Sequence, residues 1–293
     1  KVSVTGNGDR FPLPVSTNST LYTDVLGDNL IIVTTETVVI YSHNGKQLCN
    51  QPHNFAKPGL SVNNGRAVVF DRGGKGFYLF DEEKMSYEGT AENIIISAEY
   101  GKDGNYALAT KTNGATSALV VYDKHNKVIF QWNCAHENIV SITLSDNGRY
   151  AGVAVLGAEN GEIVTTVKYF GFDYKEALNT QKIVGVSPFD IQFTKLNSIT
   201  LLTDKGVFLV ERKAEKYETV TTYYSTEFNS CDMSANGDFI ISLAKYGSKN
   251  DFRINFFKPN GKLKKEISVS DDIITTCISE KYIFALSEEH IRV

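Results

Sequence analysis

Two families of tight turns recur along the chain at a common spacing, and this repeat constrains the fold more than any other feature. The first family contains Asn-Gly or Asp-Gly, and its glycines are separated by 39, 44 and 89 residues: Gly65, Gly104, Gly148 and Gly237. The second family ends in lysine, with separations of 38, 43 and 135 residues: Lys46, Lys84, Lys127 and Lys262. Because 89 is two periods and 135 is three, both families repeat at about 42 residues.

The segments between these turns are short and rich in Val, Ile, Thr, Tyr and Phe, a composition typical of β-strands. Asn-Gly and Asp-Gly supply the positive φ that tight hairpins need. We place the first turn family between strands one and two of a repeating unit, and the second between strands three and four. A four-stranded unit of this length is one blade of a β-propeller.

The sequence therefore predicts an all-β fold, a single β-propeller of seven four-stranded blades. We expect one domain over residues 1–293, with blades at about 20–52, 58–90, 93–133, 138–183, 187–222, 228–268 and 272–293. The last blade lacks an outer strand, and an unpaired strand edge is an aggregation hazard. We expect the N-terminal strand, residues 1–5, to pair there and close the ring. The aromatic residues that follow three of the turn glycines, Tyr106, Tyr150 and Phe239, should occupy equivalent buried positions on strand two.

Composition and spacing point away from several functional classes. The chain has 30 basic and 34 acidic side chains, which is not the basic footprint of a nucleic-acid binder. No Cys-x-x-Cys pair and no two histidines at helical spacing occur, so we expect no metal and no cofactor. No Gly-x-Ser-x-Gly elbow is present, and we assign no catalytic residue. The cysteines are interpreted as small buried hydrophobes: Cys49, Cys134, Cys231 and Cys277.

Short apolar motifs ending in a turn extend over nearly the whole chain. They are Phe11-Pro12-Leu13-Pro14-Val15, Val39-Ile40-Tyr41 with Asn44-Gly45-Lys46, Val68-Val69-Phe70-Asp71-Arg72-Gly73-Gly74, Val120-Val121-Tyr122-Asp123, Phe130-Gln131-Trp132 and Leu144-Ser145-Asp146-Asn147-Gly148. Together they resemble an uncharacterised propeller family, a domain of unknown function, of Gram-positive bacteria. The chain also resembles WD-repeat and quinoprotein-like propellers in outline, although it lacks Gly-His and Trp-Asp pairs and has the single Trp132.

The resemblance implies a location and a class of function. Members of that family have no assigned activity and carry an N-terminal transmembrane helix, which this chain lacks, with the propeller outside the cytoplasm and tethered to the membrane. We therefore expect a non-enzymatic, extracellular scaffold that binds a protein or glycan partner at the cell envelope, and no nucleic acid. One alternative is an extracellular hydrolase or lyase acting on glycan through acidic residues in the central funnel, such as Asp271-Asp272 and Glu288-Glu289. The other is an intracellular protein–protein scaffold.

The loops between strands two and three vary in length, whereas the two turn families are uniform. Variable loops on a rigid scaffold are where recognition usually occurs. Chain direction places these loops on the same rim as the connections between blades. The binding residues predicted on this rim are Asp71, Arg72, Asp204, Tyr246 and Glu288. The glycine-rich stretch 71–76 is interpreted as a hairpin rather than a phosphate cradle, because no helix follows it.

Overall fold

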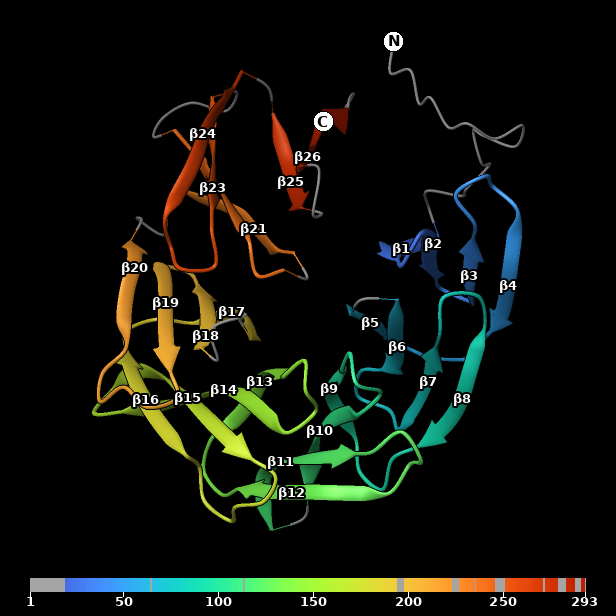
Figure 1. The fold of residues 1–293 in the computed structure, drawn as a ribbon, viewed down its shortest axis with the longest axis horizontal. Coiled ribbons are helices and arrows are strands. Elements are labelled where there is room, and N and C mark those ends of the chain that lie inside the picture. The colour runs from blue at the N-terminus through green and yellow to red at the C-terminus, as the bar shows by residue number, and fades with distance from the viewer. Residues whose placement is uncertain are drawn as a thin grey trace. The chain divides into compact units, whose positions relative to one another are not determined.

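The structure is a computed structural model whose residues form 27 β-strands in consecutive antiparallel sheets (Figure 1). It describes residues 19–63, 65–112, 114–193, 198–222, 227–234, 236–245, 251–270, 272–278, 283–287 and 291–292. Across this described part of the chain, no helix is long and apolar enough to cross a membrane. The chain divides into two compact units, one ending at Tyr150 and the other beginning at Ala151.

The first three sheets belong to the first unit. Blade one is β1 (Thr20–Leu26), β2 (Asn29–Thr34), β3 (Thr37–Tyr41) and β4 (Gln47–Pro52). Blade two is β5 (Pro58–Asn63), β6 (Arg66–Asp71), β7 (Gly76–Phe80) and β8 (Met85–Thr90). Blade three is β9 (Ile95–Tyr100), β10 (Tyr106–Thr112), β11 (Ala115–Tyr122) and β12 (Val128–Cys134).

The next sheet spans the unit boundary, and the last three belong to the second unit. Blade four is β13 (Asn138–Leu144), β14 (Tyr150–Glu159), β15 (Glu162–Gly171) and β16 (Asn179–Val184). Blade five is β17 (Pro188–Phe193), β18 (Ser198–Thr203), β19 (Gly206–Glu211) and β20 (Glu218–Thr222). Blade six is β21 (Phe228–Met233), β22 (Phe239–Ala244), β23 (Phe252–Phe257) and β24 (Leu263–Val269). The last sheet is β25 (Ile273–Ile278), β26 (Ile283–Ser287) and β27 (Ile291–Arg292).

This succession of up-and-down sheets is the repeat of a β-propeller, but the predicted number of four-stranded blades is wrong. Among the described residues six sheets have four strands and the last has three. The described chain after Ser287 contains one further strand, Ile291–Arg292, and it is the third strand of that sheet. Residues 1–5, predicted to be the closing strand, lie outside the described residues.

The turn chemistry predicted from the sequence is confirmed. The first turn family joins strands one and two of its blades with positive φ at Gly65, Gly104, Gly148 and Gly237. The second joins strands three and four, with positive φ at Gly45, Asn126 and Gly261. These backbone conformations are strained for most side chains, which explains the choice of glycine and asparagine at each repeat.

The inner strands of each blade are buried on both faces. On β7, Tyr78 and Phe80 pack against the side chains of blade one, including Ile31. The alternate residues of the same strand, Phe77 and Leu79, pack against those of blade three. Successive side chains of a strand point to opposite faces, so one strand contributes to two cores, and sequence alternation decides what each interface contains.

The three aromatic residues predicted to be equivalent all begin the second strand of their blade, but their burial differs. Tyr106 is 2% exposed, and its ring stacks on that of Tyr122 with centroids 4.8 Å apart. Phe239 is fully buried and stacks on Phe257 in the same way. Tyr150 is only half-buried, because it directly follows the exposed Arg149 at the end of its turn. The prediction of a buried Tyr150 is therefore wrong.

The connection between blades one and two carries an aromatic plug, the buried Phe55. Its ring lies 4.9 Å from that of Tyr78, and a Cβ added to Gly76 would lie 2.8 Å from it. His53 stacks on Phe55 with centroids 5.1 Å apart. The Phe55 amide donates to His53 Nδ1 at 3.2 Å, so the imidazole is neutral and its Nε2–H donates to the Thr34 carbonyl at 3.1 Å. The packing of Phe55 therefore depends on His53 being neutral, because the Phe55 amide donates to its Nδ1.

We expect Tyr106→Ala to lower the free energy of unfolding by about 3–5 kcal/mol, because it removes a fully buried aromatic side chain. Tyr150→Ala should cost clearly less, since a half-buried ring leaves a smaller cavity. Urea denaturation of both variants measures the difference. Equal losses would show that the turn position, rather than burial, sets the cost.

We expect the protein to lose stability on acidification through His53. Burial, the largest cause, lowers the pKa of this imidazole below its ordinary value. The unfolded chain then binds the proton at higher pH than the folded one, so stability falls as the pH drops below about 6.5. His53→Gln should lose less stability than the wild type between about pH 7.5 and about pH 5 in denaturant titrations. An identical pH profile would contradict this role.

Candidate functional site

The loops between strands two and three are tied to the connections that flank their blade. In blade two, the Gly73 amide donates to the Ile95 carbonyl at 2.9 Å, and the Ile95 amide donates to the Gly74 carbonyl at 2.8 Å. The Lys75 ammonium donates to the Glu92 carbonyl at 2.7 Å. These bonds connect the β6–β7 hairpin to the start of blade three, which makes this rim a rigid surface rather than a set of free loops.

The glycine-rich stretch 71–76 is the predicted hairpin. Its amides at Arg72, Gly73 and Gly74 donate to the carbonyls of Lys57, Ile95 and Asp71, respectively. Because these donors are already used within the protein, they are not available to a phosphate.

Two of the predicted binding residues, Asp71 and Asp204, have the same local role in different blades. The Lys57 amide donates to Asp71 Oδ1 at 3.0 Å, and the Ser187 amide donates to Asp204 Oδ1 at 2.7 Å. In each case a backbone hydrogen bond also runs in the opposite direction. The Arg72 amide donates to the Lys57 carbonyl, and the Asp204 amide donates to the Ser187 carbonyl. Each carboxylate thus holds the preceding connection against its blade.

The remaining predicted residues are placed as follows. The Arg72 guanidinium carbon lies 5.9 Å from the centroid of the Phe70 ring, next to Asp71. Asp71 and Arg72 belong to the first unit and Asp204 to the second, and each is described within its own unit. Tyr246 and Glu288 lie outside the described residues.

Exposed apolar side chains gather at the start of the first strands in the second unit. Phe189, which begins blade five with Pro188, is 44% exposed and stacks on Phe228 of blade six with centroids 4.7 Å apart. Beside Phe228, the Asn229 side chain donates to the Ile273 carbonyl of the last sheet at 3.0 Å. The next residue, Ile274, is 52% exposed. We call Phe189, Phe228 and Ile274 the apolar rim patch.

The alternative of a glycan hydrolase or lyase requires carboxylates, and several occur on the first strands of the blades. Glu99 accepts hydrogen bonds from Ser61 at 2.5 Å and from Asn63 at 3.4 Å. Asp190 accepts from the Ile191 amide and Asp232 from the Ile278 amide, both at 2.8 Å.

Three of the four paired carboxylates proposed from sequence lie outside the described residues. Of the residues named for the funnel, Asp272 is exposed, and Asp271, Glu288 and Glu289 lie outside the described residues. No group of three potential metal ligands occurs among the side chains that the structure describes.

The cysteines are less uniform than predicted. Cys134 is buried and Cys277 is exposed, so the interpretation of four buried hydrophobes is wrong for Cys277. Burial, together with nearby Asp190 and Asp232, raises the pKa of the half-buried Cys231 thiol to about 12, and such a thiol is a poor nucleophile.

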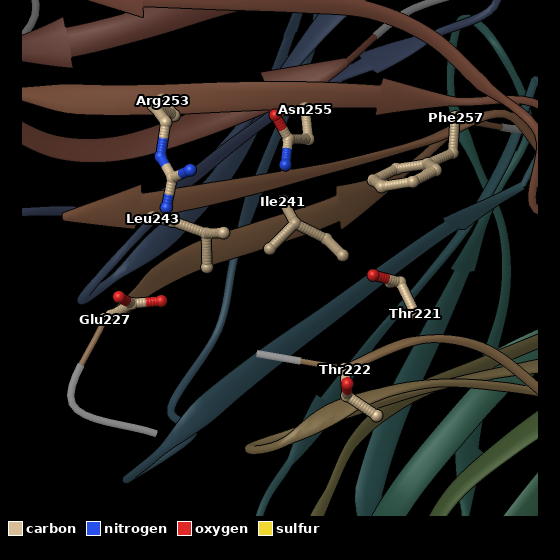
Figure 2. A pocket seen from close by; sticks show the side chains of 8 residues that line it. All are labelled: Thr221, Thr222, Glu227, Ile241, Leu243, Arg253, Asn255 and Phe257. Carbon is tan, nitrogen blue, oxygen red and sulfur yellow. The ribbon is translucent and has the colours of Figure 1, made fainter. Parts of the chain in front are cut away.

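A cavity of about 200 Å³ lies between blades five and six (Figure 2). Its apolar wall consists of Ile241, Leu243 and Phe257. Its polar lining comes from β20, from the start of blade six and from β23: Thr221, Thr222, Glu227, Arg253 and Asn255. Arg253 Nε and Asn255 Oδ1 are buried and have no hydrogen-bond partner among the described residues.

Sequence reasoning missed Arg253 and Asn255 because it describes the segments between the turns by composition alone, and residues 252–257 are rich in Ile and Phe. The signal was present in the alternation Phe252-Arg253-Ile254-Asn255, which puts polar residues on one face of an inner strand. Inner strands elsewhere in the repeat, such as Gly76-Phe77-Tyr78-Leu79-Phe80, are apolar on both faces.

Comparison with known proteins gives a family and a fold. A family model described as a family of unknown function (DUF5711) matches residues 13–293. No curated protein matches the chain. The family match confirms the expected resemblance to a family without assigned function.

Two solved propellers are similar in fold. The β-propeller domain of Cps50 (Swd1) from Myceliophteria thermophila has a TM-score of 0.63 at 14% identity, covering 95% of this chain and 98% of that chain. The Dos1 propeller has a TM-score of 0.61 at 10% identity, covering 90% of this chain and 73% of that chain. Identities this low establish the β-propeller fold alone.

We expect Asp204→Ala to cost about 1–2 kcal/mol of stability, because the Ser187 amide loses a charged acceptor. Asp204→Asn should cost less, since its amide oxygen can accept the same bond. Asp146→Ala is the matched control, because its exposed carboxylate contacts only the exposed Lys102 ammonium at 3.5 Å, and such surface pairs contribute little. Urea denaturation of the three variants would contradict a positioning role if Asp204→Ala matched the control.

Proposed function

Because the chain belongs to the family of unknown function DUF5711, its function has to be inferred from its own surface, and we propose that the propeller is a non-enzymatic module that binds a protein partner through the apolar rim patch. The observation that carries the proposal is the exposure of Phe189 on the first strand of blade five and of Ile274 on the first strand of the last sheet, with blade six between them. Large apolar groups gathered on one surface commonly mark an interaction site.

The geometry of the patch suits an interface core. Phe189 is held by its stack on Phe228, so its ring loses little freedom when a partner covers it. The Asp204 carboxylate fixes Ser187, two residues before Phe189. Rigid aromatic anchors surrounded by polar groups are the usual centre of a protein–protein interface.

The partner class follows from the chemistry of the patch, and its location follows from the family resemblance. The patch combines the aromatic Phe189 with the aliphatic Ile274, and apolar groups of both kinds are typical of the core of a protein–protein interface, so we propose a protein partner. We place the partner at the cell envelope on the resemblance alone, and this supplies the extract in which to search for it.

The test is capture of a partner from cell-envelope extract by the purified propeller. Phe189→Ser combined with Ile274→Ser should reduce the captured partner at least about tenfold, the effect of losing roughly 1.4 kcal/mol at the interface. Leu263→Ser is the matched control: its side chain is 48% exposed and begins β24, on the opposite rim. Quantitative mass spectrometry of the three captures gives the comparison.

The proposal is judged by comparing the amount of partner captured by the wild type, the double variant and Leu263→Ser. Loss with the double variant and retention with Leu263→Ser support the proposal. A partner retained by the double variant, or lost equally with Leu263→Ser, would overturn binding through the apolar rim patch.

A further inference from the structure

The cavity between blades five and six occupies a position that is filled with apolar groups in the first unit. Strand register makes the correspondence: Phe80 pairs with Ala67 on β6, and Phe257 pairs with Phe239 on β22. Counting back along each third strand, Arg253 corresponds to Gly76 and Asn255 to Tyr78. In the first unit the Phe55 ring packs over Gly76 and Tyr78. In the second unit the same two positions carry a guanidinium and an amide.

The Arg253 side chain has no hydrogen bond or ion pair within the part of the chain that the structure describes. Its Nε is buried, and so is the unpartnered Oδ1 of Asn255. Leaving buried polar groups unpaired destabilises a fold, and native structures do so rarely. The unpartnered Arg253 Nε on the wall of an open cavity points to a ligand that supplies an acceptor for this guanidinium.

The Glu227 carboxylate, whose charge is opposite to that of the Arg253 guanidinium, lines the same cavity. Phe228 pairs with Leu243, and Leu243 pairs with Arg253. Glu227 directly precedes Phe228, so it lies one strand beyond Leu243 on the side opposite Arg253 (Figure 2). Two strand spacings separate the backbones by about 10 Å. Among the described residues Glu227 and Arg253 form no ion pair, and the apolar Leu243 side chain stands between them.

We propose that this cavity binds a free α-amino acid with an aliphatic side chain. Its carboxylate pairs with the Arg253 guanidinium and its ammonium with the Glu227 carboxylate, across Leu243. Its side chain packs on Ile241 and Phe257, which form the apolar wall. A volume of about 200 Å³ is below the roughly 300–1,000 Å³ of common ligand pockets, which suits a molecule of this size. The cavity adjoins the apolar rim patch at Phe228 but uses none of its three residues, and the inference does not depend on a protein partner.

The test is calorimetric titration of the whole chain with L-leucine, N-acetyl-L-leucine and L-leucinamide. L-leucine should bind, and each blocked derivative should bind at least about tenfold more weakly, because each loses one charge. Arg253→Met and Glu227→Gln should each weaken L-leucine binding by a similar factor. The matched controls are Arg149→Met and Glu218→Gln, which change exposed residues outside the cavity and should bind as the wild type does.

Stability provides a second readout that separates binding from folding. Arg253→Met removes an unpartnered buried polar atom, so its melting temperature without ligand should equal or exceed that of the wild type. L-leucine should raise the melting temperature of the wild type and leave that of Arg253→Met unchanged. If Arg253→Met failed to fold, Arg253→Lys, which keeps a charge but not the planar donor set, would take its place.

Three results would overturn the proposal. The first is no heat and no thermal shift with L-leucine at millimolar concentration. The second is binding of N-acetyl-L-leucine as tight as that of L-leucine, which would assign the cavity to the carboxyl end of a peptide. The third is equally tight binding of L-leucinamide, which would assign it to an amino end.

Discussion

Burial of both faces of every blade is the constraint on which the rest of this structure depends. The inner strands β6, β7, β18, β19 and β22 are largely buried, and no blade of this kind can hide both of its faces alone. Each strand therefore divides its side chains between two neighbours, as Phe77 and Tyr78 do on β7. The turns and the connections serve that arrangement: positive-φ glycines close the hairpins, and carboxylates such as Asp71 hold the connections in place.

Local chemistry was predictable from the sequence, whereas features that depend on several segments were not. Gly104 and Gly148 mark their turns because few other residues adopt that backbone conformation. The partial exposure of Tyr150 was not predictable. Tyr106 and Tyr150 both begin the second strand of their blade, but Tyr106 is buried there, whereas Tyr150 is half-buried next to an exposed turn. The number of four-stranded blades was overestimated because the seventh depended on residues 1–5 as its outer strand, and the last sheet has three strands in the described chain.

In the candidate sites, too, local features were predictable from the sequence and features that depend on packing were not. Asp71 and Asp204 each lie where strand two of their blade leads into strand three, as expected, but their hydrogen bonds give them a positioning role that spacing alone does not reveal. The apolar rim patch brings Phe189 onto Phe228, 39 positions away in the sequence, and only packing shows the stack. Arg253 was overlooked because the average hydrophobicity of its strand conceals which face each residue occupies.

The correspondence between Gly76 and Arg253 bears on how proteins of this kind diverge. At the interface of blades one and two, Gly76 leaves room for the Phe55 ring, whereas at the interface of blades five and six the corresponding Arg253 lines a cavity. Neither the turns nor the first strands have to change for that exchange. Ligand cavities can therefore be gained, lost or engineered at one blade interface at a time. A repeated architecture offers as many places for such a change as it has interfaces between blades.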